Sequence, residues 1–142
     1  MTIVYPVHLN PNVWGPVHET IGKIANVHLL PPLDYAPFVS LMQRSFFILT
    51  DSGGIQEEAP ALNKPVLVMR EETERSEAVG TGAARLVGTE PKTIVSEAER
   101  LLTNSRCHSD MVRAANPYGE GTAAQSIVRI LRQFGEQKSW GT

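Results

Sequence analysis

The sequence contains a single cysteine, Cys107, among its 142 residues, so no disulfide bond can form within the chain. This cysteine usage gives no sign of an oxidising compartment, and we expect a reducing, cytoplasmic setting. No histidine or acidic constellation surrounds Cys107, which leaves a metal site and a thiol nucleophile without support. We therefore predict neither a resident metal ion nor a cofactor.

An excess of charge of one sign and long apolar runs are also missing. The 13 Lys and Arg residues nearly balance the 15 Asp and Glu residues, and the net charge is −2. This balance removes the basic footprint of a nucleic-acid-binding protein. Residues Met1 to Tyr5 lack the basic flank and apolar core of a signal peptide, and no apolar run is long enough to span a membrane. We expect neither nucleic acid nor a membrane as a partner.

What the chain does have is enough apolar content for a core. Hydrophobic residues make up 42% of it, and a single domain covering residues 1–142 would bury well over half of its unfolded surface. Short runs without polar alternation indicate parallel strands covered on both faces. These runs are Ile3 to Val7, Val27 to Leu30, Phe46 to Leu49, Val66 to Met69 and Ala84 to Val87.

Segments with helical periodicity accompany these runs. Asp34 to Arg44 carries its apolar residues on one stripe behind an Asp N-cap. Pro91 to Thr103 and Ala123 to Phe134 have the same pattern, and in the second of these Thr122 is expected to cap the start and Gly135 to stop the helix. The alternation predicts an α/β fold, a Rossmann-like parallel sheet of about five strands flanked by helices.

The most informative stretch runs from Phe46 to Pro60. A predicted buried strand leads into Ser52, Gly53 and Gly54 and then directly into a helix. An anion is favoured at a helix start, because the first amides lack partners and the macrodipole is positive there. The glycines let a phosphate approach the backbone, and Ser52 adds a hydroxyl donor. In isolation such a turn is more often only structural, but ligands of open parallel sheets bind at the carboxyl ends of the strands.

Charged residues near this turn have two interpretations each. Glu57 and Glu58 point about 100° apart on a helix, so at most one faces a ligand, where it would accept hydrogen bonds from ribose hydroxyls; dipole compensation explains them without a ligand. An arginine within Arg70 to Glu77 would match a diphosphate with its planar fork of donors, whereas local salt bridges are the simpler interpretation. Pro60 is expected to kink the helix or end it early.

Two histidines differ in context. His8 follows the first predicted strand at its carboxyl end, where contact with a ligand and capping of the following turn are equally compatible with the sequence. His28 lies inside an apolar run and is predicted to be a hydrogen-bonded core residue.

Several segments, taken together, closely resemble the non-hydrolysing UDP-N-acetylglucosamine 2-epimerases. They follow the family's order over nearly the whole chain, and they are Tyr5 to Val13, Pro32 to Phe38, Thr50 to Pro60, Thr73 to Arg75 and Asn116 to Gly119. The resemblance implies the GT-B architecture, in which two Rossmann-like halves hold UDP in the cleft between them. It implies that this chain is a portion of the C-terminal half, which makes most of the contacts with UDP.

The resemblance also implies roles for individual residues. Ser52, Gly53 and Gly54 would bind the diphosphate, and Arg75 would contact the phosphates. Glu58 would bind the ribose hydroxyls.

On the base side of the nucleotide, the resemblance implies that Phe38 holds the uracil through its backbone. Leu33 stands where family members often have a glutamine, so its contact with the base would also be through the backbone. Trp14 replaces a common charged residue and Ser76 replaces a common proline, and neither touches the inferred phosphate site.

The family interconverts UDP-N-acetylglucosamine and UDP-N-acetylmannosamine, a step that the resemblance links to polysaccharide synthesis. UDP is eliminated to leave a 2-acetamidoglucal and is added back after a proton returns to the opposite face of C2. In the family, the proton is handled by carboxylates of the N-terminal half and by a histidine in a Gly-His-Arg-Arg segment, and neither is found here. The resemblance thus implies UDP binding, no catalytic residue in this chain, and a requirement for the N-terminal half as partner.

The resemblance further implies that the chain lacks the first strand and helix of its own Rossmann-like half. That strand is central in the family's sheet, so its absence predicts an unpaired edge, with rearranged pairing, association with another copy of the chain, or marginal stability.

Two alternatives remain open at this point. The first is another GT-B enzyme of nucleotide sugars, such as a hydrolysing 2-epimerase or a glycosyltransferase half, to which the run from Asp51 to Glu58 is less similar. The second is a non-catalytic nucleotide-binding or assembly module.

Overall fold

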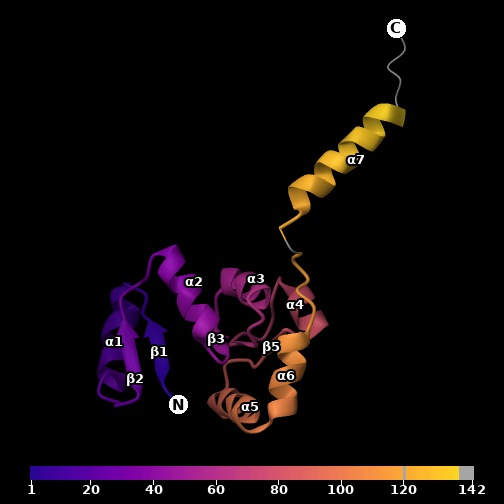
Figure 1. The fold of residues 1–142 in the computed structure, drawn as a ribbon. Coiled ribbons are helices and arrows are strands. Elements are labelled where there is room, and N and C mark those ends of the chain that lie inside the picture. Colours follow the sequence, from indigo (N-terminus) through magenta and orange to yellow (C-terminus); the bar gives the residue numbers. More distant parts are fainter. Residues whose placement is uncertain (120, 138–142) are drawn as a thin grey trace. The chain divides into compact units, whose positions relative to one another are not determined.

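The computed structural model describes residues 1–119 and 121–137, in which strands alternate with helices (Figure 1). All five strands pair in parallel, and this confirms the predicted α/β class. The strands are divided between two sheets, with the orders β1-β2 and β3-β4-β5. The chain likewise divides into two compact units, Met1–Leu41 and Met42–Thr142.

The first unit contains β1 (Ile3–Pro6), α1 (Pro11–Ile21) and β2 (Val27–Leu30). Both strands lie where the apolar runs predict them, but α1 is not marked by such a pattern. It begins after Asn10, whose side chain accepts a hydrogen bond from the Asn12 amide (3.0 Å). Proline at the first helical position of α1 removes only an amide that has no partner in the helix.

The strands of the first unit are more exposed than predicted. Ile3, Val4 and Tyr5 keep 42%, 37% and 38% of their surface exposed, because two strands supply too little apolar area to bury both faces of a sheet. His28 on β2 is exposed too, so its prediction as a core residue is wrong. Val7 is buried, and its amide donates to the Leu30 carbonyl (2.8 Å).

The second unit is built on β3 (Ile48–Thr50), β4 (Val66–Val68) and β5 (Ala84–Leu86). β4 is the central strand of this sheet, and all three of its residues are completely buried. Successive side chains of a strand point to opposite faces, so β4 contributes to a core on each side. Here the predicted strand covered on both faces is confirmed.

Two pairs of helices cover the faces of this sheet. α3 (Gly53–Ala61) and α4 (Ser76–Thr81) pack on one face, where Ala59 and Ala78 join Val66 and Val68. α5 (Pro91–Thr103) and α6 (Ser105–Arg113) pack on the other face, and their buried residues join Leu67 there. The periodicity of the sequence predicts α5 with its observed bounds, whereas α4 and α6 are too short to stand out.

The observed ends of three helices can be compared with the boundaries predicted from cap, proline and glycine residues. α2 (Tyr35–Arg44) begins directly after the predicted cap, and α3 ends one residue after Pro60. α7 (Ala123–Gln137) continues through Gly135, so the predicted stop there is wrong. Glycine ends a helix by adopting a positive φ, and Gly135 is not among the glycines that do so. In the described ranges, no helix is both long and apolar enough to cross a membrane.

Adjacent leucines of α5 test this arrangement. Leu101 is 1% exposed and belongs to the core against β4, while Leu102 is 41% exposed. Leu101→Ala is expected to lower the free energy of unfolding by about 2–5 kcal/mol, because it leaves a cavity in a packed core. Leu102→Ala, the control, is expected to change it by about 1 kcal/mol at most. Urea denaturation measures both values, and equal losses would contradict the packing of α5.

Candidate functional site

Three loops leave the carboxyl edge of the β3-β4-β5 sheet. They follow the last residues of the three strands and lie at one edge because the strands are parallel. Arg70, in the loop after β4, donates from Nε to the carbonyl of Asp51 in the loop after β3 (2.6 Å). Glu71 Oε1 accepts a hydrogen bond from the amide of Thr89 in the loop after β5 (3.1 Å). Polar contacts therefore tie the loop after β4 to both of its neighbours.

The loop after β3 ends at the start of α3. Ser52 is the N-cap residue, with φ −77° and ψ 132°, and its side chain makes no capping hydrogen bond. Ser52 and Gly54 are exposed and Gly53 is half-buried. The first amides of a helix have no acceptor within the helix, and the positive end of its dipole lies there. The structure confirms that this turn lies at the carboxyl edge and is open.

Arg75, at the end of the loop after β4, lies beside this turn. A Cβ atom on Gly53 would lie 3.3 Å from Glu74 Oε1, 3.8 Å from Arg75 Cζ and 3.9 Å from Arg75 Nη2. A Cβ on Gly54 would have only Ser52 Oγ near it, at 4.0 Å. The fold thus places the residues predicted to contact phosphate close together, although they come from two separate loops. Arg75 lies on the Gly53 side, and the space at Gly54 is open.

Carboxylates hold the Arg75 guanidinium in this place. Its Nε donates to Glu57 Oε1 (2.5 Å), and its Nη1 lies 2.9 Å from Glu74 Oε1. The hydrogen bond with Glu57, followed by the charges of both carboxylates, raises the pKa of Arg75. Nη2 makes neither contact and lies near Gly53. The predicted local salt bridges therefore exist, and they leave one nitrogen of the fork turned toward the helix start.

Glu74 contacts a second arginine as well. Its Oε2 lies 3.4 Å from Arg70 Nη1. The pKa of Glu74 is lowered by hydrogen bonding with its own backbone, and the charges of Arg75 and Arg70 lower it further. Glu74 is thus a carboxylate between two arginines at the edge where an anion is predicted to bind.

The two adjacent glutamates of α3 have different surroundings. Glu57 pairs with Arg75. Glu58 is half-buried, and with the described residues its side chain makes no hydrogen bond or ion pair. This agrees with the expectation that the two side chains point apart, and it leaves the Glu58 carboxylate available as an acceptor.

Sequence reasoning assigned no role to Tyr118, and it named Arg70 only as one end of a loop in which an arginine would match a diphosphate. Burial, followed by the charge of Glu77, raises the pKa of Tyr118, and the charges of Glu57 and Arg75 also act on it. Tyr118 therefore lies near the Arg75 cluster, but it stands in a turn without any periodic pattern. The one available signal for Arg70 is its position directly after the strand run that ends at Met69.

The remaining predicted site residues belong to the first unit. His8 is exposed, and its Nδ1 accepts a hydrogen bond from the Asn10 amide (3.1 Å), which is the turn-capping role. Leu33 and Phe38 are half-buried. The Phe38 amide donates to the Asp34 carbonyl (3.0 Å), so a backbone contact with a base would use the Phe38 carbonyl, which has two lone pairs.

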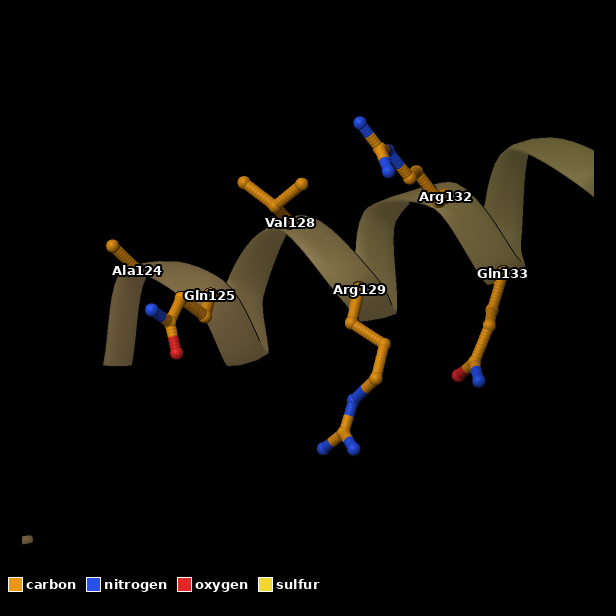
Figure 2. A pocket seen from close by; sticks show the side chains of 6 residues that line it. All are labelled: Ala124, Gln125, Val128, Arg129, Arg132 and Gln133. Carbon is orange, nitrogen blue, oxygen red and sulfur yellow. The ribbon is translucent and has the colours of Figure 1, made fainter. Parts of the chain in front are cut away.

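Hollows elsewhere on the surface do not contain the predicted residues. One hollow, of about 520 Å³, lies along α7 and is lined by Ala124, Gln125, Val128, Arg129, Arg132 and Gln133 (Figure 2). These residues form two adjacent rows on one helix, so no second wall encloses a ligand. Another hollow, of about 450 Å³, lies beside Arg85 and Arg100. In the part of the chain that the structure describes, no three His, Cys, Asp or Glu side chains are grouped as a metal site requires.

Comparison with known proteins gives independent information. The family profile described as "UDP-N-acetylglucosamine 2-epimerase" matches residues 1–132. A probable UDP-N-acetylglucosamine 2-epimerase of Ralstonia solanacearum is 57% identical over 132 residues, which make up 93% of this chain and 35% of that protein. The chain therefore spans little more than a third of the length of this curated relative.

Two solved structures are similar to this chain over nearly all of it. UDP-GlcNAc 2-epimerase from Neisseria meningitidis, bound to UDP-GlcNAc, has 47% sequence identity and a TM-score of 0.85, and the match covers 94% of this chain and 36% of that one. MnaA of S. aureus, in a co-structure with UDP, has 40% sequence identity and a TM-score of 0.86. The match covers 99% of this chain and 38% of that one.

The different surroundings of Glu57 and Glu58 lead to a prediction. Glu57→Gln is expected to lower the free energy of unfolding slightly in low salt, because it removes a partly exposed ion pair with Arg75. The loss is expected to shrink in 1 M salt, where the charges are screened. Glu58→Gln, the control, is expected to have no such salt-dependent effect. Urea denaturation at the two salt concentrations measures this, and the reverse pattern would contradict the geometry.

Proposed function

Because the chain belongs to the UDP-N-acetylglucosamine 2-epimerase family, we propose that it binds UDP, and the UDP part of a UDP-sugar, at the carboxyl edge of the β3-β4-β5 sheet. The observation that carries this proposal is the open start of α3 with the Arg75 guanidinium beside Gly53. Unpaired amides at a helix start and an arginine fork are two separate sources of attraction for a diphosphate. The ligands of the Neisseria meningitidis and S. aureus proteins support the choice of UDP.

The proposed roles follow the geometry of the second unit. The Ser52 hydroxyl and the amides of Gly53 and Gly54 donate to the diphosphate, and Arg75 donates to it from Nη2. Glu58, which has no partner among the described residues, accepts hydrogen bonds from the ribose hydroxyls.

For the base, we propose backbone contacts at Leu33 and Phe38, with His8 nearby. All three lie in the first unit. In this proposal, residues 1–142 act as one UDP-binding, Rossmann-like domain.

The whole protein, we propose, interconverts UDP-N-acetylglucosamine and UDP-N-acetylmannosamine. The bond from C1 to the UDP oxygen breaks as a proton leaves C2, which gives 2-acetamidoglucal and UDP. The proton returns to the opposite face of C2, and UDP adds back at C1. The chain's part is to stabilise the charge that develops on the departing phosphate, with amides and an arginine already in place before the reaction.

The groups that move the proton lie, in this proposal, in an N-terminal half outside these residues. The chain matches only 35% of its Ralstonia solanacearum relative, which agrees with a division of the enzyme into two halves. We also propose a homo-oligomer in the cytoplasm, in a polysaccharide pathway. β1 and β3 each pair with one described strand only, and an unpaired strand edge is a surface for association.

Calorimetric titration tests the nucleotide site. The chain is expected to bind UDP and UDP-N-acetylglucosamine in preference to ADP. Glu58→Ala is expected to weaken UDP binding about tenfold or more, because hydrogen bonds to a charged group are lost, and Ser52→Ala about three- to tenfold, because a neutral one is lost. Glu72→Ala and Ser96→Ala, which remove the same groups from exposed positions, serve as controls. A folded chain that binds no UDP would favour a non-catalytic module of another kind.

The proposed roles of the two halves, UDP binding in this chain and proton transfer in the N-terminal half, give a second test. With UDP-N-acetylglucosamine as substrate, these 142 residues alone are expected to form no UDP-N-acetylmannosamine, since they hold UDP but supply no acid or base at C2. A protein that also includes the N-terminal half is expected to form it. Chromatography of the sugar nucleotides follows the product, and free N-acetylmannosamine in its place would indicate a hydrolysing enzyme.

A further inference from the structure

Gln56 is a buried polar side chain of α3, four residues after the cap residue Ser52. It is 0% exposed and is the only buried polar residue among residues 1–119 and 121–135. A buried amide is costly unless its groups are hydrogen-bonded. Gln56 Nε2 donates to the Ser52 carbonyl (3.2 Å), and Gln56 Oε1 accepts from the Thr73 hydroxyl (2.6 Å). Its two ends therefore contact two different loops of the carboxyl edge.

The chain of hydrogen bonds continues from Thr73 to Arg75. The Arg75 amide donates to Thr73 Oγ1 (3.0 Å), and the same hydroxyl donates its proton to Gln56. Each donor and acceptor in the series has a matching partner. The backbone at Ser52 is thereby connected to the backbone at Arg75 through two side chains, and these residues flank the proposed diphosphate position.

A purely local role for Thr73 does not account for this arrangement. A threonine hydroxyl often accepts from the amide two residues later to form a turn, and that contact explains the bond with Arg75. It does not require the second bond to Gln56, which comes from a different element. Nor does a buried glutamine help a core that apolar side chains fill at lower cost.

We propose that Gln56 and Thr73 are positioning residues that hold the backbone of Arg75 at a set distance from the start of α3, so that Arg75 Nη2 and the α3 amides bind the same diphosphate. This inference rests on the proposed function. The hydrogen-bonded series from Ser52 through Gln56 and Thr73 to Arg75, called the relay below, sets where the backbone of Arg75 lies. Glu57 and Glu74 orient its guanidinium. A donor held in place before binding loses less conformational entropy when the ligand arrives.

Variants at Thr73 in the full chain test the relay. Thr73→Val keeps the shape of the side chain and removes the hydroxyl, and Thr73→Ser keeps the hydroxyl. Thr73→Val is expected to weaken UDP binding about three- to tenfold, while Thr73→Ser binds like the original chain. The affinity for uridine, which has no phosphate, is expected to be unchanged in both. Equal weakening of UDP and uridine, or no weakening of UDP, would overturn the proposal.

A double-mutant cycle with Arg75→Ala shows whether Thr73 acts through Arg75. Once the guanidinium is gone, Thr73→Val is expected to cause no further loss of UDP affinity. A second loss of the same size in the Arg75→Ala background would mean that Thr73 acts elsewhere, and the relay would be rejected.

Exchange of the Arg75 Nε–H proton with water, followed by NMR without ligand, separates this inference from the proposed function. The contact with Glu57 protects that proton, and Thr73→Val is expected to speed its exchange at least threefold, with no change for Thr73→Ser. Faster exchange in a chain that binds no UDP would leave the relay standing and reject the nucleotide site. Unchanged exchange in Thr73→Val would reject the relay, whether or not UDP binds.

Discussion

The parallel pairing of β4 between β3 and β5 is the constraint on which the site depends. Because the three strands run in one direction, the loops that follow them meet at one edge. β4 is buried on both faces, and a shift of its register by one residue would turn Leu67 toward the wrong helices. The distance between Ser52 and Arg75 is therefore set first by apolar packing, and the polar contacts across the edge refine it.

Both arginines at this edge are paired with carboxylates. Arg70 and Arg75 are each in contact with Glu74, and Arg75 also with Glu57. Such partly exposed ion pairs add little to stability, but they orient a guanidinium that would otherwise sample many rotamers. At the proposed site, an incoming diphosphate would compete with these carboxylates for the same donors.

Patterns in the sequence found the long or strongly apolar elements. β2 and α5 have the predicted bounds, because their apolar residues form a nearly apolar run or one clear stripe. The short helices α4 and α6 carry too few periodic residues to be recognised. His28 and Gly135 show the limit of local reasoning. The burial of His28 depended on layers that a two-stranded sheet does not have, and Gly135 ends a helix only if it takes a conformation that it does not adopt.

By itself, the sequence determined the α/β class, the family, and the start of α3 directly after Ser52, because each depends on neighbouring residues or on the order of motifs. The tertiary structure alone decided that Arg75 pairs with Glu57, that Glu58 is left without a partner among the described residues, and that Gln56 reaches Thr73. These contacts join residues separated along the chain by β4 and its loops. Only the crossover that places β4 beside β3 brings them within hydrogen-bonding distance, and no local pattern encodes which of two adjacent glutamates will face the arginine.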